Sequence, residues 1–376
     1  MENALRFVKD TLRFLDPQLF LGAILASGLG ILLVNSATAG AAGGISRLVI
    51  VQALATCLGI TVTVILTRID FDVLSGLWLV FYGLAAAAII FTIFFGRGPT
   101  GDSNKNWIYL GFVSIQPAEF VKIAYILIFA HAIEKCKENI SSLRSLLYLG
   151  AVAGGLLALM ALQGDMGNML VFLFITVAML FAAGLNWKYF AGGIVLATLA
   201  APLLWTKVLS SYMRDRILFG FRPELDPSGY GYQAIQSKIA IASGQLAGKG
   251  YLNGTQVKII PARETDFIFA TAGEEFGLIG CLIVVGVLLF LMLRTLKIAK
   301  LSQNDVGVMV CTGFFALLFA QTFENIGMCL ALLPVIGITL PFFSYGGSSV
   351  LSLWCGVALV MSVWAQSRRT LSFDQY

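Results

Sequence analysis

Residues 276–293 read FGLIGCLIVVGVLLFLML, an apolar run with no charged side chain between Glu275 and Arg294. A run of ~18 such residues is long enough to cross a bilayer as a helix. Lipid offers the backbone no hydrogen-bond partner, so a helix, which pairs its own N–H and C=O groups, is the favoured structure. The stretch therefore predicts a membrane-spanning helix.

The same pattern recurs along the chain. Its 376 residues are 58% hydrophobic and 12% charged, whereas soluble domains carry about 25% charged residues. This composition excludes an ordinary soluble protein and predicts an all-α integral membrane protein, a single polytopic domain over residues 1–376 with ten transmembrane helices. The predicted spans are residues 18–36, 47–67, 74–95, 115–134, 143–162, 167–184, 189–206, 275–294, 307–333 and 348–366.

The distribution of Lys and Arg predicts the orientation, because these residues gather in short cytoplasmic loops. With both termini inside, the short loops on the outer side hold only Arg47, Arg97 and Lys105. The tails and loops on the inner side hold Arg6, Lys9, Arg13, Arg68, Lys135, Lys137, Arg144, Lys188, Arg294, Lys297, Lys300, Arg368 and Arg369. We therefore expect both termini to be cytoplasmic.

One long connection separates the seventh and eighth spans, at about residues 207–272. It is rich in Lys and Arg although the orientation places it outside, and long loops escape the charge rule. Connections of this length without regular structure are uncommon and tend to be functional. We expect a large extracytoplasmic loop that contains a helix of its own around Gln233–Ser243.

Charged residues within a membrane helix cost at least ~2.5–3.5 kcal/mol, so each is a functional candidate. In Gln116–Lys122, Pro117 is placed to start the fourth helix, and Glu119 and Lys122 lie three residues apart on one face. The two can form an ion pair. Whether that pair is functional or merely ties helices together stays open at this point.

Two aspartates lie at connections on the predicted outer side. Asp165 is in the tight turn between the fifth and sixth spans, where it is either a site residue or simply a helix N-cap. Asp266 stands beside aromatic residues where the long loop re-enters the membrane, and desolvation there would raise its proton affinity as suits a general base. Solvated loop charge is the alternative for Asp266, and Glu274 and Glu275 are candidates for helix-dipole partners.

The ninth span carries Glu324 and Asn325, and residues 334–349 follow with two prolines and a Gly-Gly pair. Non-helical backbone at membrane depth is tolerated only when it is buried in protein or lines a wet cavity. This segment is therefore predicted to border a cavity near the outer leaflet. Most of the charged residues described above fall in the predicted outer half of the membrane. This distribution favours one shared site over an ion pathway, which would place ionisable groups at several depths.

Other chemistries find no support in the sequence. The single histidine, His131, has no catalytic triad available to it, and no Gly-rich phosphate loop ends in Gly-Lys-Ser/Thr. The six cysteines show no paired spacing, so neither a disulfide framework nor a zinc site is indicated.

Several long motifs in one order resemble the SEDS family (shape, elongation, division and sporulation). They are residues 116–122, 222–227, 231–233, 235–244, 265–269 and 341–349. The stretch Gly248–Gln256 is more similar to the RodA elongation branch than to the FtsW division branch. The resemblance implies ten transmembrane helices with a large extracytoplasmic loop between the seventh and eighth.

The resemblance also implies an activity, that of a peptidoglycan glycosyltransferase polymerising lipid II at the outer face of the bacterial cytoplasmic membrane during cell elongation. The 4-hydroxyl of one disaccharide attacks the anomeric carbon of the growing strand, and undecaprenyl diphosphate leaves. The leaving diphosphate needs its charge neutralised, and the family's dependence on Mg or Mn implies a divalent cation with unknown ligands. Arg214, Arg216 and Arg222 are candidates for diphosphate contact, with solvated loop charge as the alternative.

By position, Asp266 matches the family's essential loop aspartate and is the expected general base. Glu119 and Lys122 match the charged pair of the family's fourth helix, which lines its central cavity, and Asp165 matches the acidic residue of the connection between the fifth and sixth helices. The resemblance implies that these three residues orient Asp266 or bind substrate. One departure is the sequence Gln-Gly-Asp-Met-Gly-Asn at 163–168, where the family usually has Gln-Pro-Asp-Leu-Gly-Thr.

The implied partners are lipid II, a class B penicillin-binding protein acting as transpeptidase, and other membrane proteins of the elongation complex; no nucleic acid is expected. A lipid II flippase or other transporter is the main alternative, because polar residues lie between helices and no soluble catalytic machinery is present. A non-catalytic scaffold for other wall enzymes is the third hypothesis.

Overall fold

The computed structural model describes residues 14–39, 45–98, 105–109, 111 and 114–373, and most of them are helical. The basic residues Arg6, Lys9 and Arg13 lie outside the described residues. The long helices are α2 (Pro17–Thr38), α3 (Arg47–Leu66), α5 (Trp78–Phe95), α6 (Pro117–Lys135), α7 (Leu143–Gln163), α8 (Met166–Ala182), α9 (Trp187–Leu203), α12 (Ile268–Leu301), α13 (Asp305–Cys329) and α14 (Gly347–Phe373).

Each of the ten predicted ranges overlaps one of these helices. Eight candidate spans among the described residues are long and apolar enough to cross a membrane: α2, α3, α5, α7, α9 with its π-helical extension Leu204–Val208, α12, α13 and α14. Helix α8 is shorter, with 17 residues, and α6 carries Glu119, Lys122 and Glu134. The chain is thus a multi-pass membrane protein, while the crossing of all ten helices stays a prediction.

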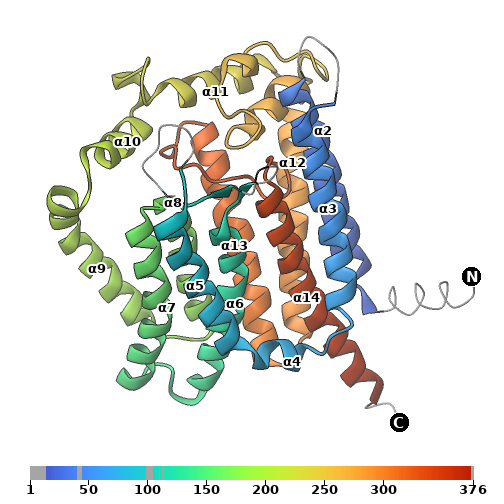
Figure 1. The fold of residues 1–376 in the computed structure, drawn as a ribbon, viewed down its shortest axis with the longest axis vertical. Helices are drawn as coiled ribbons and strands as arrows, with labels where there is room; N and C mark the ends of the chain where they lie inside the picture. Colours follow the sequence, from blue (N-terminus) through green and yellow to red (C-terminus); the bar gives the residue numbers. More distant parts are fainter. Residues whose placement is uncertain (1–13, 40–44, 99–104, 110, 112–113, 374–376) are drawn as a thin grey trace, which may run out of the picture.

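The centre of the bundle is built from α6, α13 and α14. Tyr125 and Phe129 of α6, Phe314 of α13 and Trp354 of α14 are fully buried. Helix α14 packs along α3, and α13 packs against α6, α8 and α12. Helix α9 has no buried residue and runs apart from the bundle (Figure 1). An apolar helix exposed on all sides fits a lipid environment.

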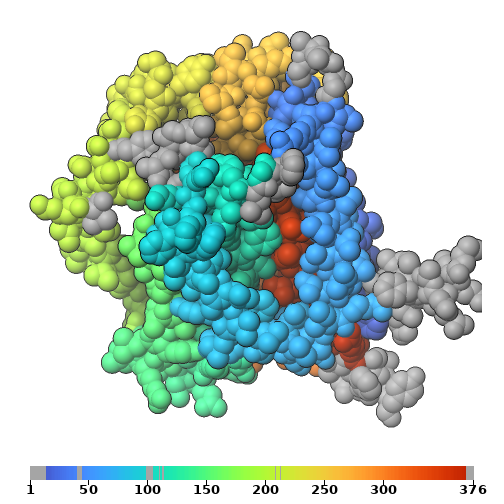
Figure 2. Space-filling model, viewed as in Figure 1, coloured from blue at the N-terminus to red at the C-terminus, as the bar shows by residue number. Residues whose placement is uncertain are grey.

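A groove runs between α3 and α5, with α14 visible at its base (Figure 2). The groove has a volume of about 450 Å³ and is lined by apolar side chains of α3, α5, α6 and α14 and of the short helix α4 (Phe71–Gly76). All six cysteines are free, and Cys355 lies in this groove.

The connection between α9 and α12, here called the outer segment (residues 209–267), covers one end of the bundle (Figure 1). It contains α10 (Ser211–Phe221), the 3-10 turn Pro223–Leu225, α11 (Tyr232–Ser243) and the 3-10 turn Val257–Ile259. The predicted helix around Gln233–Ser243 is confirmed as α11, whereas α10 was not predicted. The start of α2 and the end of α14 lie at the opposite end of the bundle (Figure 1).

Helix α12 begins at Ile268, well before the predicted start at residue 275, because it is interrupted. Gly277 has φ 64° and ψ −159°, a backbone conformation outside the helical region. The backbone of the outer segment enters the break: Leu278 N donates to Gln245 O at 2.8 Å and Ile279 N to Leu246 O at 3.2 Å. Residues 268–276 thus form a short helix of their own. This helix connects the outer segment to the long part of α12.

Replacing Gly277 by alanine should destabilise the fold. A Cβ there would lie 2.5 Å from Gly248 N and Leu246 O, in a conformation that side chains rarely adopt. Strain of this kind costs about 1–3 kcal/mol before the clash is counted. Thermal unfolding in detergent should show a lower midpoint for Gly277→Ala than for Gly286→Ala, a matched control on the same helix with nothing within 4 Å. Equal midpoints would mean that the break is not a fixed feature.

Candidate active site

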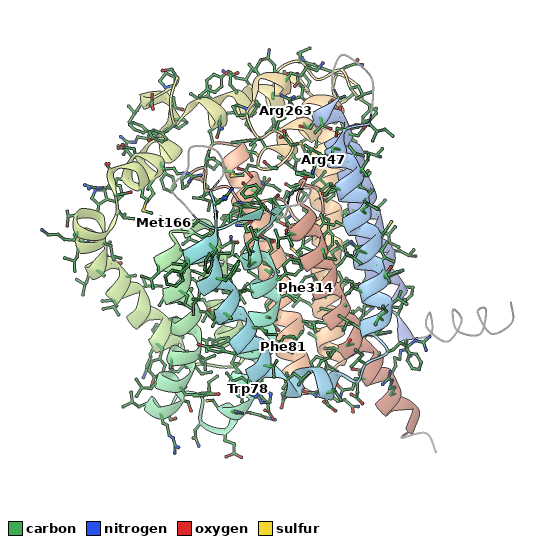
Figure 3. All side chains as sticks on the ribbon, viewed as in Figure 1. Arg47, Trp78, Phe81, Met166, Arg263 and Phe314 are labelled. Carbon is green, nitrogen blue, oxygen red and sulfur yellow. The ribbon has the colours of Figure 1, made fainter. Side chains whose placement is uncertain are left out.

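A cavity of about 760 Å³ opens where α6, α8 and α10 meet the loops at 262–266 and 334–349. Its charged lining residues are Glu119, Asp165, Arg216 and Asp266. Met166, another lining residue, lies at the end of α8 that faces the outer segment (Figure 3). The lining includes Pro334, residues 336–339 and residues 345, 346, 348 and 349, which confirms that this irregular segment borders a cavity.

The backbone around Asp266 is fixed by hydrogen bonds to distant parts of the chain. Tyr345 N donates to Glu264 O at 2.8 Å, and Ser344 Oγ donates to Thr265 O at 2.5 Å. Asn325 Nδ2 donates to Asp266 O at 2.8 Å. Three hydrogen bonds, two from residues 344–345 and one from α13, therefore fix the position of Asp266 at the cavity wall.

Asn325 links the two loops that form this wall. Its Nδ2 also donates to Ile338 O at 2.7 Å, and the side chain is fully buried in α13. Asn325 therefore acts as a positioning residue, holding Asp266 against the irregular segment. From sequence it was only a polar residue in an apolar span, a signal that marked its importance but not its role.

The half-buried Asp266 carboxyl binds its proton more tightly than an ordinary aspartate. Burial raises its pKa to about 6, while the Arg216 guanidinium and a hydrogen bond from Thr265 act in the opposite direction, and Glu264 adds to the rise. Arg216 is held by its Nε, which donates to Val335 O at 2.6 Å. Gly337 lies beside both groups, since a Cβ there would be 3.6 Å from Asp266 Oδ2 and 3.8 Å from Arg216 Nη2.

Asp165 serves both as a helix cap and as a wall of the cavity. Its Oδ1 accepts from Asn168 N at 3.1 Å, which is the N-cap bond of α8. Its Oδ2 accepts from the side-chain amides of Asn168 at 2.9 Å, Asn106 at 3.1 Å and Gln116 at 3.3 Å. Both alternatives left open by the sequence therefore hold, because Asp165 caps α8 and the same carboxylate lines the cavity.

Glu119 and Lys122 form a buried ion pair. Lys122 Nζ donates to Glu119 Oε1 at 2.8 Å, and the side chains of Lys122 and Glu119 are 1% and 7% exposed, respectively. Pro117 is the first residue of α6, as predicted, so Glu119 falls in the first turn. Glu119 lines the cavity, whereas Lys122 lies behind it within electrostatic range of Glu324 on α13.

The other predicted residues lie elsewhere. Arg216 lines the cavity, but Arg214 and Arg222 do not. Arg222 is exposed just beyond α10. Arg214 is half-buried, and positions two apart on a helix differ by ~200° in direction, so α10 presents Arg214 and Arg216 to different surroundings.

Glu274 and Glu275 stabilise the outer segment instead of lining the cavity. Glu274 is fully buried and accepts from the backbone N–H groups of Thr255, Gln256 and Val257 at 2.9, 2.8 and 2.6 Å. Lys249 Nζ donates to Glu274 at 2.5 Å, and Ser36 Oγ donates to Glu275. Their role is to hold the outer segment on the bundle, which is more than the helix-dipole effect that their position suggested.

Comparisons with known proteins agree on one family. The model of the FtsW/RodA/SpoVE cell cycle proteins matches residues 17–369. The peptidoglycan glycosyltransferase MrdB of Escherichia coli (strain K12) is 36% identical over 310 residues, which cover 81% of this chain and 82% of MrdB. The probable peptidoglycan glycosyltransferase FtsW of Geobacter metallireducens is 34% identical over 281 residues, which cover 73% of each chain.

Solved structures give the same result. A chain from a peptidoglycan synthase complex that coordinates polymerization and crosslinking superposes with a TM-score of 0.81 at 27% identity, covering 94% of this chain and 98% of that one. The rod shape determining protein RodA of Thermus thermophilus superposes with a TM-score of 0.70 at 26% identity, covering 93% and 96%.

Proposed function

Because the chain belongs to the FtsW/RodA/SpoVE family of cell cycle proteins and is a peptidoglycan glycosyltransferase, we propose that its cavity polymerises lipid II with Asp266 as the general base. One observation carries the proposal. Asp266 is anchored by its backbone at the wall of a cavity that Glu119 and Asp165, from distant parts of the chain, also line. A fixed carboxylate with raised proton affinity in a polar cavity is suited to accept a proton from a substrate hydroxyl.

The reaction joins two lipid-linked disaccharides. The 4-hydroxyl of one sugar attacks the anomeric carbon of the growing strand, and the Asp266 carboxylate accepts the hydroxyl proton. The bond to undecaprenyl diphosphate breaks and its electron pair leaves with the diphosphate. Arg216, beside Asp266, keeps the carboxyl ionised near neutral pH and offers positive charge to the substrate. Arg214 and Arg222, outside the cavity, have no contact role in this scheme.

A divalent cation, Mg or Mn, fits the donor set of the cavity. Hard divalent cations prefer oxygen ligands, and the lining offers the carboxylates of Glu119 and Asp165 and the side-chain amides of Asn106 and Asn168. When bound there, the cation would neutralise the charge that develops on the departing diphosphate.

The topology proposed for this reaction places all ten long helices across the bacterial cytoplasmic membrane with both termini in the cytoplasm. It is supported by the Lys and Arg distribution and by the location of the outer segment at the end of the bundle opposite the start of α2 and the end of α14 (Figure 1). Cavity and outer segment then face the outer leaflet, and the activity serves wall elongation.

The proposed partner is a class B penicillin-binding protein, together with other membrane proteins of the elongation complex. Support comes from the similar chain that is part of a peptidoglycan synthase complex coordinating polymerization and crosslinking. The function is tested by supplying purified protein with lipid II, a divalent cation and its transpeptidase partner. Glycan polymer is expected on gels, and unreacted lipid II in every combination of partner and cation would contradict the proposal.

Polymerisation should depend on pH through Asp266. The base acts as the carboxylate, so the rate should fall about tenfold per unit as the pH drops below about 6, and level off above it. Arg216→Gln should move this acidic limb to higher pH, because the guanidinium lowers the pKa of Asp266. Arg222→Gln, at an exposed position outside the cavity, is the control. An acidic limb that stays in place in Arg216→Gln would contradict the assignment.

A further inference from the structure

Glu324 is an acidic residue of the apolar helix α13 that the proposed reaction does not use. Its side chain is half-buried and does not line the cavity. Its Oε2 atom is buried and has no hydrogen-bond partner among the described residues. Charged side chains within membrane helices are costly and usually pair with another group of the bundle. The carboxylate of Glu324 therefore needs a partner.

A second polar side chain on α13 also lacks partners. Gln321 precedes Glu324 by three residues, so the two side chains leave the helix roughly 60° apart. Gln321 is 1% exposed, and neither its Oε1 nor its Nε2 has a hydrogen-bond partner in the described parts of the chain. Leaving a buried acceptor unsatisfied is costly. This side of α13 thus presents two buried oxygen acceptors, Glu324 Oε2 and Gln321 Oε1, that no donor satisfies.

Lys122 of α6 shows the opposite imbalance. A lysine ammonium carries three N–H donors, and within the described residues Lys122 Nζ donates only to Glu119 Oε1. The side chain of Lys122 is 1% exposed, so bulk water does not satisfy the other two donors. Buried donors on α6 and buried acceptors on α13 therefore complement each other.

The packing of α13 against α6 brings these groups to one face. Gly313 of α13 lies against α6, since a Cβ there would be 2.6 Å from Ile126 Cγ2. Glu324 follows Gly313 by three helical turns and points within about 20° of the same direction. Helix α6 begins at the cavity and α13 ends there, so Lys122, one turn before Ile126, and Glu324 both lie on the cavity side of this contact. The Lys122 ammonium is accordingly within electrostatic range of Glu324.

We propose that Glu324 is a positioning residue that acts on the cavity through Lys122. Lys122 then has two carboxylate partners, Glu119 at the cavity wall and Glu324 behind it, and its flexible stem lets the ammonium turn from one to the other. Turning toward Glu324 and Gln321 frees the Glu119 carboxylate to accept hydrogen bonds from substrate hydroxyls. Turning back neutralises Glu119. The inference rests on the proposed function for the substrate that Glu119 meets.

The interaction between Lys122 and Glu324 can be tested without activity. Equilibrium constants of unfolding in mixed micelles for the wild type, Glu324→Gln, Lys122→Met and the double variant form a double-mutant cycle. Without Lys122 the charge of Glu324 has no partner, so the double variant should be at least roughly fivefold more stable than the two single effects predict together. Glu138→Gln, at an exposed position in the turn after α6, is the matched control and should be additive with Lys122→Met.

Steady-state kinetics with lipid II tests the effect of Glu324 on the cavity. Glu324→Gln should lower kcat/KM about tenfold, mainly through a higher KM, because Lys122 then stays on Glu119 and a hydrogen-bond acceptor for the substrate is lost. In a Glu119→Gln background the same substitution should cause little further loss, since Glu119 is the group through which Glu324 acts. A merely structural Glu324 would lower kcat/KM equally in both backgrounds. Glu138→Gln should leave kcat/KM unchanged in each.

The proposal is overturned if the unfolding cycle of Lys122 and Glu324 is additive. It is also overturned if Glu324→Gln leaves kcat/KM unchanged, or lowers it equally with and without Glu119. Should Lys122→Met fail to fold, the kinetic comparison, which uses no Lys122 variant, still decides. If the wild type forms no polymer, the proposed function fails, whereas a non-additive unfolding cycle would still support the interaction of Lys122 with Glu324.

Discussion

Asp266→Asn is expected to lower the rate of polymerisation by about 100- to 10,000-fold, the usual contribution of a general base. Asparagine keeps the size and planarity of the side chain but cannot accept the proton. The fold should survive, because Asn325 anchors the backbone carbonyl of Asp266 and not its carboxylate. The loss should be measured in single-turnover assays with lipid II, alongside thermal unfolding in the same detergent.

The control for Asp266→Asn is Asp215→Asn, which removes a carboxylate from the outer segment at a position that does not line the cavity. That variant should polymerise lipid II at close to the wild-type rate. Polymerisation by Asp266→Asn within a few fold of the wild-type rate would remove Asp266 from its role as base. A lowered unfolding midpoint would instead assign the loss to folding.

Lys122→Met is expected to lower the free energy of unfolding by about 3–5 kcal/mol, because removing one partner of a buried ion pair leaves an uncompensated charge. Glu119 would keep its buried carboxylate, and Glu324 would lose the nearby positive charge as well. The double variant Glu119→Gln/Lys122→Met should recover part of the loss. The free energies of unfolding of the wild type, the single variant and the double variant can be measured by reversible unfolding in mixed micelles.

Lys137→Met tests whether the burial of the Glu119–Lys122 pair causes the loss of stability expected for Lys122→Met. Lys137 pairs with Asp305 at the surface, where both side chains are more than half exposed, and exposed pairs contribute little. Its removal should leave stability nearly unchanged. If Lys122→Met were equally harmless while polymerisation was lost, the pair would be functional and not structural, which decides between the two interpretations that the sequence left open.

Hydropathy predicted the long helices well because lipid leaves the backbone few alternatives. Local chemistry also predicted that Pro117 begins α6 and where α11 lies, and it offered the N-cap of α8 as one of two roles for Asp165. The break at Gly277 was missed, since its cause is the backbone of residues 245–250 entering from far along the chain. No hydropathy window reports such a contact.

The candidate site was predicted in part. Family motifs indicated Asp266, Glu119 and Asp165, and the structure brings these residues to one cavity. The choice among the three arginines could not be made from sequence, because it depends on α10, a helix that was not predicted, and on the direction in which α10 presents each side chain. The amides around Asp165 were missed for a similar reason: Asn106, Gln116 and Asn168 are ordinary polar residues until the helix ends bring them together.

The central claim is that acidic side chains in one outward-facing cavity form a glycosidic bond rather than move a lipid. It is tested most directly in sealed vesicles that hold the protein and its transpeptidase partner, with fluorescent lipid II supplied only to the leaflet that faces the outer segment. Glycan polymer should form there without prior movement of the headgroup, and it should be absent with Asp266→Asn. Headgroup translocation with no polymer from the wild type would contradict the account.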